Sequence, residues 1–269
     1  RDSAPDRWGR HLIDRRAVFE ANANGSALRT RDEIDYLLGV YDASRQGALR
    51  FRIPGSDGYL SPNESVPPLV DLKRLLSASN QISLGSIENN QVKELLDAGS
   101  GSLGGARPKA SVTDGGRLLL AKFSHPGDEW DVMAWEKTSL DVARAVGLAV
   151  PVARLLRIGS DSVLLLERFD RESSLLNGPR IPYLSAMSLV GARDGSQCDY
   201  ADVADALVDW CRDPLPQLES LFTRVALSIA LHNTDDHLRN LGLLRKRVSW
   251  VLSPGFDVSI SPDPGKQRL

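Results

Sequence analysis

The stretch Leu231-His232-Asn233-Thr234-Asp235-Asp236-His237-Leu238-Arg239-Asn240-Leu241-Gly242-Leu243-Leu244 contains the polar residues around which the chain is organised. In it, Asp235 and Asn240 stand five residues apart between two apolar flanks, on a loop-like interruption rather than on a regular face. A strand-like run follows, and Leu252-Ser253-Pro254-Gly255-Phe256-Asp257 then supplies a second acid. Carboxylate and amide oxygens are the ligands that Mg²⁺ prefers, so this spacing indicates metal-assisted phosphoryl transfer.

The order Asp, Asn, Asp is the one in which protein kinases supply a catalytic base and two Mg²⁺ ligands. Asp235 would accept the proton of the attacking hydroxyl, and Asn240 and Asp257 would hold Mg²⁺. An Asx-rich turn that caps a helix is the simpler alternative. A third interpretation is a metal hydrolase, in which His232 and His237 would bind the metal. Against it, no H-E-x-x-H pattern is present, and the spacing of the two histidines places them on different faces of a helix. We expect these histidines to orient the loop by hydrogen bonds.

Composition limits the class of protein. With 269 residues, 42% of them hydrophobic, the chain can form one large domain or two lobes. The net charge of −2 argues against a broad nucleic-acid or membrane surface, and no apolar run approaches a bilayer span of roughly 20 residues. Two cysteines without ligand spacing are typical of a reducing cytoplasm. The chain begins on Arg1 rather than Met and stops shortly after Asp257, so we expect a piece of a longer protein.

A glycine-rich stretch precedes the strands. It reads Ser102-Leu103-Gly104-Gly105-Ala106-Arg107-Pro108-Lys109, and its glycines would let backbone N–H groups approach phosphates, with Lys109 adding charge. A flexible linker is an alternative interpretation of the same sequence. Lys122 ends an apolar strand, where it can reach phosphates or face water, and Glu136 on the next helix is a candidate partner. Glu167-Arg168-Phe169-Asp170-Arg171 then closes a strand. By itself this segment is an ordinary charged turn; in a kinase the same place offers backbone groups to adenine.

The coarse order of elements is glycine loop, hairpin, helix, hairpin and connector, followed by helices. We predict helices at 6–20, 32–38, 69–79, 129–146, 183–191, 199–211 and 217–231, and strands at 47–53, 110–113, 117–123, 152–158 and 162–168. Asp114-Gly115-Gly116 predicts a hairpin turn. The fold class that follows is α+β, a two-lobed protein-kinase-like fold. The N-lobe, 1–168, is mixed α/β and the C-lobe, 169–269, mainly helical.

Seven stretches together resemble the HipA family of bacterial toxin kinases, and they fall in family order. They are Pro5-Asp6-Arg7-Trp8-Gly9-Arg10, Gly47-Ala48-Leu49-Arg50-Phe51, the glycine-rich stretch, Ala121-Lys122-Phe123, Leu166-Glu167-Arg168-Phe169-Asp170-Arg171, Asn233-Thr234-Asp235-Asp236-His237-Leu238-Arg239-Asn240 and Leu252-Ser253-Pro254-Gly255-Phe256-Asp257. The T-D-x-H-x-x-N and L-S-P-x-x-D patterns are specific, and the glycine loop becomes specific in their company.

The resemblance implies a role for each matched residue. Asp235 is then the catalytic base, Asn240 and Asp257 are the Mg²⁺ ligands, and Lys122 contacts the phosphates of ATP. In addition, Ser102, Gly104, Gly105 and Lys109 belong to the nucleotide-binding loop, and Glu167 and Phe169 mark the adenine-binding connector. Ser102 also matches the serine that family members autophosphorylate, where added negative charge beside ATP silences the enzyme.

The resemblance further implies a serine/threonine protein kinase that is the toxin of a type II toxin–antitoxin module. Its partner would be a small helix-turn-helix antitoxin, so that DNA is contacted only through the antitoxin. Its substrate would be a host protein of the translation machinery, with aminoacyl-tRNA synthetases a prominent class. Full-length members usually carry a further N-terminal segment and a longer helical C-terminal portion, and we expect both to be missing from this sequence. A small-molecule kinase and a catalytically silent pseudokinase remain as rivals, the latter opposed by intact Lys122, Asp235, Asn240 and Asp257.

Overall fold

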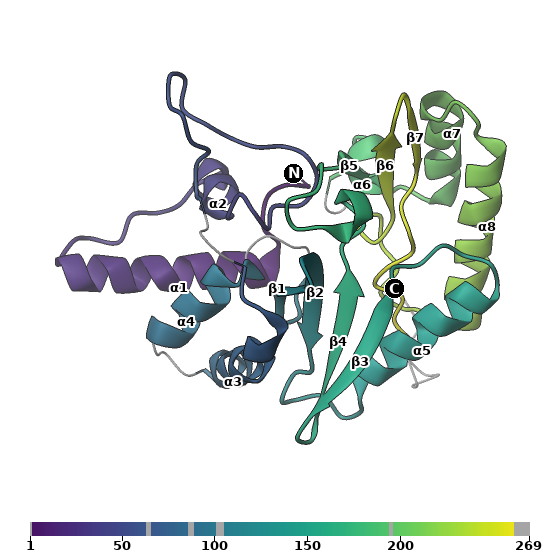
Figure 1. Ribbon diagram of the computed structural model, residues 1–269. Helices are drawn as coiled ribbons and strands as arrows, with labels where there is room; N and C mark the ends of the chain where they lie inside the picture. Colours follow the sequence, from purple (N-terminus) through teal and green to yellow (C-terminus); the bar gives the residue numbers. More distant parts are fainter. Residues whose placement is uncertain (1, 63–65, 86–88, 101–104, 194–195, 261–269) are drawn as a thin grey trace.

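The computed structural model describes residues 2–62, 66–85, 89–100, 105–193 and 196–260. It is a mixed α/β structure with a four-stranded and a three-stranded sheet, each covered by helices (Figure 1). In chain order the elements are α1 (Arg7–Asn24), α2 (Glu33–Gly39), η1 (Leu69–Asp71), α3 (Leu72–Ser83), α4 (Asn89–Asp97), β1 (Lys109–Asp114), β2 (Arg117–Phe123), α5 (Val132–Ala145), β3 (Ala153–Ile158), β4 (Asp161–Glu167), η3 (Glu172–Ser174), β5 (Tyr183–Ser185), α6 (Ala186–Leu189), α7 (Tyr200–Trp210), α8 (Leu215–Ala230), β6 (Gly242–Lys246) and β7 (Ser249–Leu252).

The larger sheet is antiparallel throughout, in the order β1-β2-β4-β3. Its first hairpin turns at Gly115 and Gly116, both with positive φ (55° and 79°), which two-residue hairpin loops of this hand require. The predicted turn is therefore confirmed, and β2 has the predicted bounds. The centre of this sheet is β2 and β4, and both lead toward the site described below.

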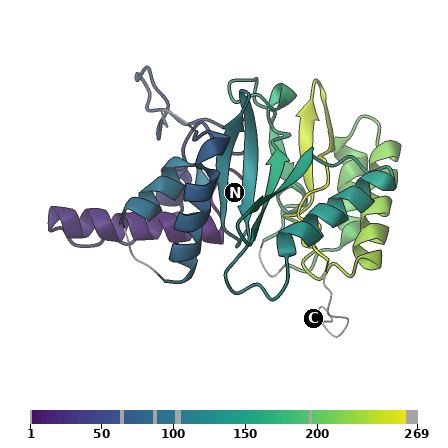
Figure 2. The same cartoon turned by 60° about the horizontal axis from the view of Figure 1, so that its bottom comes forward.

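Alternation along β2 divides its side chains between two faces. Leu119, Ala121 and Phe123 pack in a core with α1, α3 and α4. Leu120 lies on the opposite face, in the cluster that includes Met133 of α5. Figure 2 shows α1, α3 and α4 on one side of the sheet and α5 on the other. Because β4 is buried on both faces, its run Val163-Leu164-Leu165-Leu166 is continuously apolar.

The smaller sheet, in the order β5-β6-β7, packs with α6, α7 and α8 around a second core. A small cluster of Ala143, Leu148 and Leu227 joins α5 and its following turn to α8. The chain after residue 169 therefore holds a sheet of its own as well as the predicted helices. Of the described helices, none is both long and apolar enough to cross a bilayer.

Two predicted elements differ in the structure. Residues 47–53 form no strand, because Gly47 N–H donates to the Asp170 carboxylate and Leu49 and Ile53 are exposed rather than paired on a sheet. The predicted helix at 183–191 begins only at Ala186, because Tyr183–Ser185 pairs with β6 as a strand. Helix α4 was not predicted; its apolar side chains Val92, Leu95 and Leu96 are buried against α1 and α3.

Candidate active site

A cleft lies where the two sheets face each other, and it encloses about 1000 Å³, part of it open to solvent. Its wall includes six of the residues predicted to form the site: Gly105, Lys122, Glu167, Phe169, Asn240 and Asp257. These residues come from the end of the glycine-rich stretch, β2, the connector after β4 and the segments that flank β6 and β7. The fold therefore brings together residues that are up to 152 positions apart in the sequence.

Lys122 lies at the base of this cleft between two carboxylates. It is buried on the α5 side of β2, and its Nζ lies 2.6 Å from Oε1 of Glu136, which α5 presents to it. The same Nζ forms an ion pair with Asp257. The pairing of Lys122 with Glu136, a candidate contact from the sequence, is thus present, and it follows from the alternation of β2.

The charges at this cluster are stabilised mutually. Burial by itself lowers the pKa of Lys122, but Asp257 and Glu136 outweigh burial and raise that pKa above its usual range, so the amine is a cation. Burial would raise the pKa of Asp257, but Lys122 and Lys109 hold it below its usual value. Glu136 is the exception, since burial raises its pKa despite the ion pair with Lys122. The cluster thus combines a buried cation with an ionised carboxylate that faces the cleft.

The glycine-rich stretch is described from Gly105 onward; Ser102 and Gly104 lie outside the described residues. Gly105 has φ +101°, and a Cβ there would lie 2.5 Å from Nζ of Lys109. Lys109 is buried, and burial lowers the pKa of its amine to about 8. The positive φ of Gly105 favours glycine, and a side chain at this position would have to displace the Lys109 amine.

The segment after α8 is a loop held by its own hydrogen bonds. Helix α8 ends before His232, whose φ is +51°, and Asp235 N–H donates to Oδ1 of Asn233 at 3.2 Å. Asn240 donates its Nδ2 to the Asp235 carbonyl at 2.9 Å, which ties the two predicted residues together. Asn240 and His237 line the cleft, whereas Asp235 is exposed beside them and is not part of the cleft wall.

The two histidines occupy different places in this loop, and their role as supports of the loop stays a prediction. His237 faces the cleft, and His232 occupies the sharp turn that ends α8. In the part of the chain that the structure describes, no three residues among His, Cys, Asp and Glu converge on one point.

Aromatic rings close the connector side of the cleft. Phe169 lies between Tyr183 and Phe256, with ring centroids 6.3 and 5.6 Å away. Glu167 is turned toward Arg117, which donates to its Oε2 at 2.8 Å. A flat ligand that entered here would meet Phe169 and the backbone of the connector.

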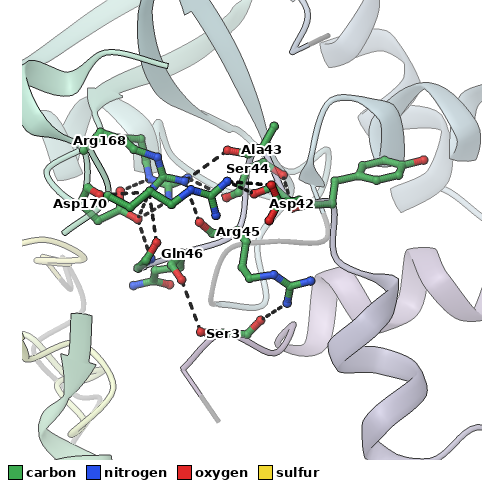
Figure 3. Close-up of polar contacts among 12 residues, drawn as sticks. Ser3, Asp42, Ala43, Ser44, Arg45, Gln46, Arg168 and Asp170 are labelled. Atoms are coloured by element: carbon green, nitrogen blue, oxygen red, sulfur yellow. Dashed lines mark hydrogen bonds and ion pairs between the residues drawn. The ribbon is translucent and has the colours of Figure 1, made fainter. Parts of the chain in front are cut away.

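The remainder of the connector, considered an ordinary charged turn from the sequence alone, is buried. Asp170, 1% exposed, accepts hydrogen bonds from Arg168 (2.6 and 2.7 Å), Arg171 (2.9 Å) and Gly47 N–H (2.7 Å). Figure 3 shows this network reaching the segment of residues 42–46 and Ser3. It fixes the connector to segments more than 120 positions upstream, so no local signal in the sequence could identify it.

Residues near the N-terminus also belong to the site and were missed. Asp2, Ala4 and Asp6 line the cleft beside Lys122 and Asp257. The sequence offered only the resemblance of Pro5-Asp6-Arg7-Trp8-Gly9-Arg10 to a family pattern, which says nothing of where these side chains point.

The sequence pattern of the HipA-like C-terminal domain family matches residues 101–268, well over half of the chain. The chain belongs to the HipA family. Comparison with curated proteins found no match.

Two solved structures are similar to this HipA-family chain. HipA of Shewanella oneidensis MR-1, from a toxin–antitoxin complex with HipB and operator DNA, shares 16% identity at a TM-score of 0.58, over 94% of this chain and 64% of that one. The second is the proinflammatory kinase CtkA of Helicobacter pylori, with 20% identity and a TM-score of 0.45, over 56% of this chain and 54% of that one. The similarity to HipA of Shewanella oneidensis is a similarity of fold. This chain spans less than two thirds of the length of either protein.

Proposed function

We propose that this protein is an ATP- and Mg²⁺-dependent serine/threonine protein kinase. The observation that supports this most is the convergence of Lys122, Asn240 and Asp257 on one cleft, beside a loop that holds Asp235. A cation, an amide and a carboxylate placed together in this way suit a polyphosphate and its metal. Membership of the HipA family agrees with this chemistry.

The residues at the cleft fit a hard cation and a nucleotide. Asn240 donates its Nδ2 to the Asp235 carbonyl, which leaves its amide oxygen as the ligand it can offer. Asp257 offers carboxylate oxygens, and its lowered pKa keeps them charged. Lys122 and Lys109 would hold the phosphates, and Phe169 with the backbone after Glu167 would receive the adenine.

In phosphoryl transfer, Asp235 would accept the proton of a serine hydroxyl while the hydroxyl oxygen bonds to the terminal phosphorus. The bond from that phosphorus to its bridging oxygen then breaks, and Lys122 offsets the charge left on the departing diphosphate. Bound Mg²⁺ supplies further positive charge against the phosphates. Positioning and charge neutralisation account for the rate enhancement.

The division into lobes is part of this proposal. An N-lobe of residues 1–168 and a mainly helical C-lobe of residues 169–269 would close on the nucleotide from the two sides of the cleft. The separate cores of the two sheets support this division.

We further propose that the kinase is the toxin of a type II toxin–antitoxin module in the cytoplasm. It would phosphorylate a host protein of the translation machinery, for instance an aminoacyl-tRNA synthetase, and be restrained by a helix-turn-helix antitoxin that mediates any contact with DNA. Autophosphorylation of Ser102 would silence it. Family membership and the solved complex of HipA with HipB and operator DNA support this role.

Brief expression in a bacterial host tests this role. Wild type should arrest growth and add phosphate to a small set of serines, whereas Asp235→Ala should do neither. Asp209→Ala is the matched control, since it removes an exposed aspartate of α7 outside the cleft and should behave as wild type. Growth and phosphoproteome unchanged by wild type would contradict the toxin role. Phosphate found only on a small metabolite would favour the small-molecule kinase.

A further inference from the structure

The N-terminus of α1 holds the end of the glycine-rich stretch. Asp6 is the N-cap residue of α1, but its side chain caps none of the N–H groups of that helix. Its Oδ2 instead accepts a hydrogen bond of 2.8 Å from Gly105 N–H, 99 positions away. Asp32, the N-cap residue of α2, shows the ordinary arrangement and accepts from Ile34 and Asp35 of its own helix. The carboxylate of Asp6 thus binds the backbone at the cleft instead of capping its own helix.

The contact is reciprocal. Trp8 N–H, in the first turn of α1, donates to the Gly105 carbonyl at 3.5 Å. Both backbone polar groups of Gly105 are therefore bonded to the start of α1, and its carbonyl accepts one of the N–H groups that the first turn of a helix leaves free. Asp6 and Gly105 both line the cleft, so this junction is part of its wall.

Helix α1 provides a fixed support for the junction. Trp8, Leu12 and Ile13 are buried in the main core with residues of α4. The chain before the helix is fixed as well, since Arg10 Nε donates to the Pro5 carbonyl at 3.1 Å and Asp2 accepts from Ser185 N–H at 2.9 Å. Residues 2–8 therefore join the glycine-rich stretch to the second sheet across one side of the cleft.

The Lys109 amine lies close to this junction. Gly105 has φ +101°, and the space where its Cβ would stand is occupied by Nζ of Lys109 at 2.5 Å. A shift of Gly105 away from α1 would therefore change the backbone against which this buried amine packs.

We propose that Asp6 is a positioning residue for the phosphates of ATP, acting through Gly105 and Lys109. The inference rests on the proposed kinase function and adds to it the N-terminal segment as a working part of the nucleotide site. Asp6 itself touches no reacting atom; it holds the backbone of Gly105 beside the cleft that would receive the phosphates. Its loss is expected to weaken binding of phosphate-bearing nucleotides while adenosine binding stays as it is.

The test compares Asp6→Ala, Asp6→Asn and wild type for binding of Mg-ATP and of adenosine by calorimetry, with KM and kcat for ATP from phosphoryl transfer. Asp6→Ala should weaken ATP binding and raise KM by about tenfold with a smaller change in kcat. Asp6→Asn retains an acceptor oxygen and should return ATP binding to within about threefold of wild type. Asp32→Ala removes an ordinary helix cap and should leave ATP binding unchanged even where it lowers Tm.

Three results would overturn the inference. Equal ATP affinity in Asp6→Ala and wild type, with only Tm lowered, would make Asp6 a structural cap. Tighter ATP binding in Asp6→Ala would show that its carboxylate competes with phosphate. Equal weakening of ATP and adenosine would show a general collapse of the cleft. If wild type itself bound no ATP, the kinase proposal would fail first, so the two failures are distinguishable.

Discussion

Asp170 is a carboxylate buried in the connector between two arginines. Burial alone would raise its pKa, but Arg168 and Arg171, together with Gly47 N–H, hold that pKa below its usual value. A buried charge pair has a large cost when one partner is removed, because the other is left uncompensated. The sequence shows the charged residues of this network but does not show that they are buried, because the segments that enclose them are far apart in the chain.

Asp170→Asn is expected to lower the free energy of unfolding by about 3 kcal/mol at pH 7. The depressed pKa of the folded carboxyl means that its contribution is present above the unfolded pKa, about 3.9, and is lost as pH falls toward the folded value. Urea unfolding of wild type and variant at several pH values should therefore show a gap that narrows below about pH 4. A gap that is constant or grows on acidification would contradict the assignment.

Gly105 gives a second prediction for a single residue. Gly105→Ala combines a positive φ with a clash against Lys109, so it should lose about 1–2 kcal/mol of stability and most of its ATP affinity. Gly25→Ala is the matched control, because Gly25 has φ +60° and nothing within 4 Å of its Cβ position. It should lose a similar amount of stability and keep wild-type ATP binding. Similar ATP affinity in the two variants would remove Gly105 from the site.

At the scale of elements, β2 and α5 together position the buried ion pair of Lys122 and Glu136. The period of two along β2 places Lys122 on the α5 face, and α5 presents Glu136 there. The sequence served well here, because the apolar run and the glycine turn identified the strand and its bounds. It left open whether Lys122 reaches phosphates or faces water. It served poorly at 47–53, where the sequence alternates but the described residues place no strand beside this segment.

Lys122→Met should therefore cost about 3 kcal/mol of stability, since it leaves Glu136 buried and Asp257 half-buried without their cation. Lys137→Met on α5 is the control. Lys137 pairs with Asp141 at the surface, and its loss should cost at most about 0.5 kcal/mol. Chemical denaturation at pH 7 measures both, and equal small losses would contradict the description of the Lys122 cluster.

At the scale of the whole molecule, the site exists only because two sheets and the N-terminal segment meet. Motif spacing and the family resemblance predicted which residues of the glycine-rich stretch, β2, the connector and the segments after α8 and β7 would gather, and six of them line one cleft. It did not predict Asp2 and Asp6, because nothing local places residues before α1 beside a glycine loop 99 positions later. Ser102 and Gly104 stay predictions.

Binding at this cleft should stabilise the whole fold. At a Mg-ATP concentration of 100 times Kd, the free energy of unfolding should rise by about 2.7 kcal/mol. Asp257→Asn and Asn240→Ala should lose most of the Mg²⁺-dependent part of this rise, whereas Asp209→Ala should retain it. Thermal unfolding with ATP, with and without Mg²⁺, measures the difference. A rise that is the same in all variants would exclude Asn240 and Asp257 as metal ligands.

Transfer of phosphate from γ-labelled ATP by purified protein tests the central claim most directly. Wild type with Mg²⁺ should label a protein, itself or one in a cell extract, and the label should be recovered as phosphoserine or phosphothreonine after acid hydrolysis of the labelled protein. Asp235→Ala should lower the rate at least about a hundredfold while its Tm stays near that of wild type, and Asp209→Ala should match wild type. Transfer by Asp235→Ala at the wild-type rate, or no transfer by wild type at all, would contradict the account.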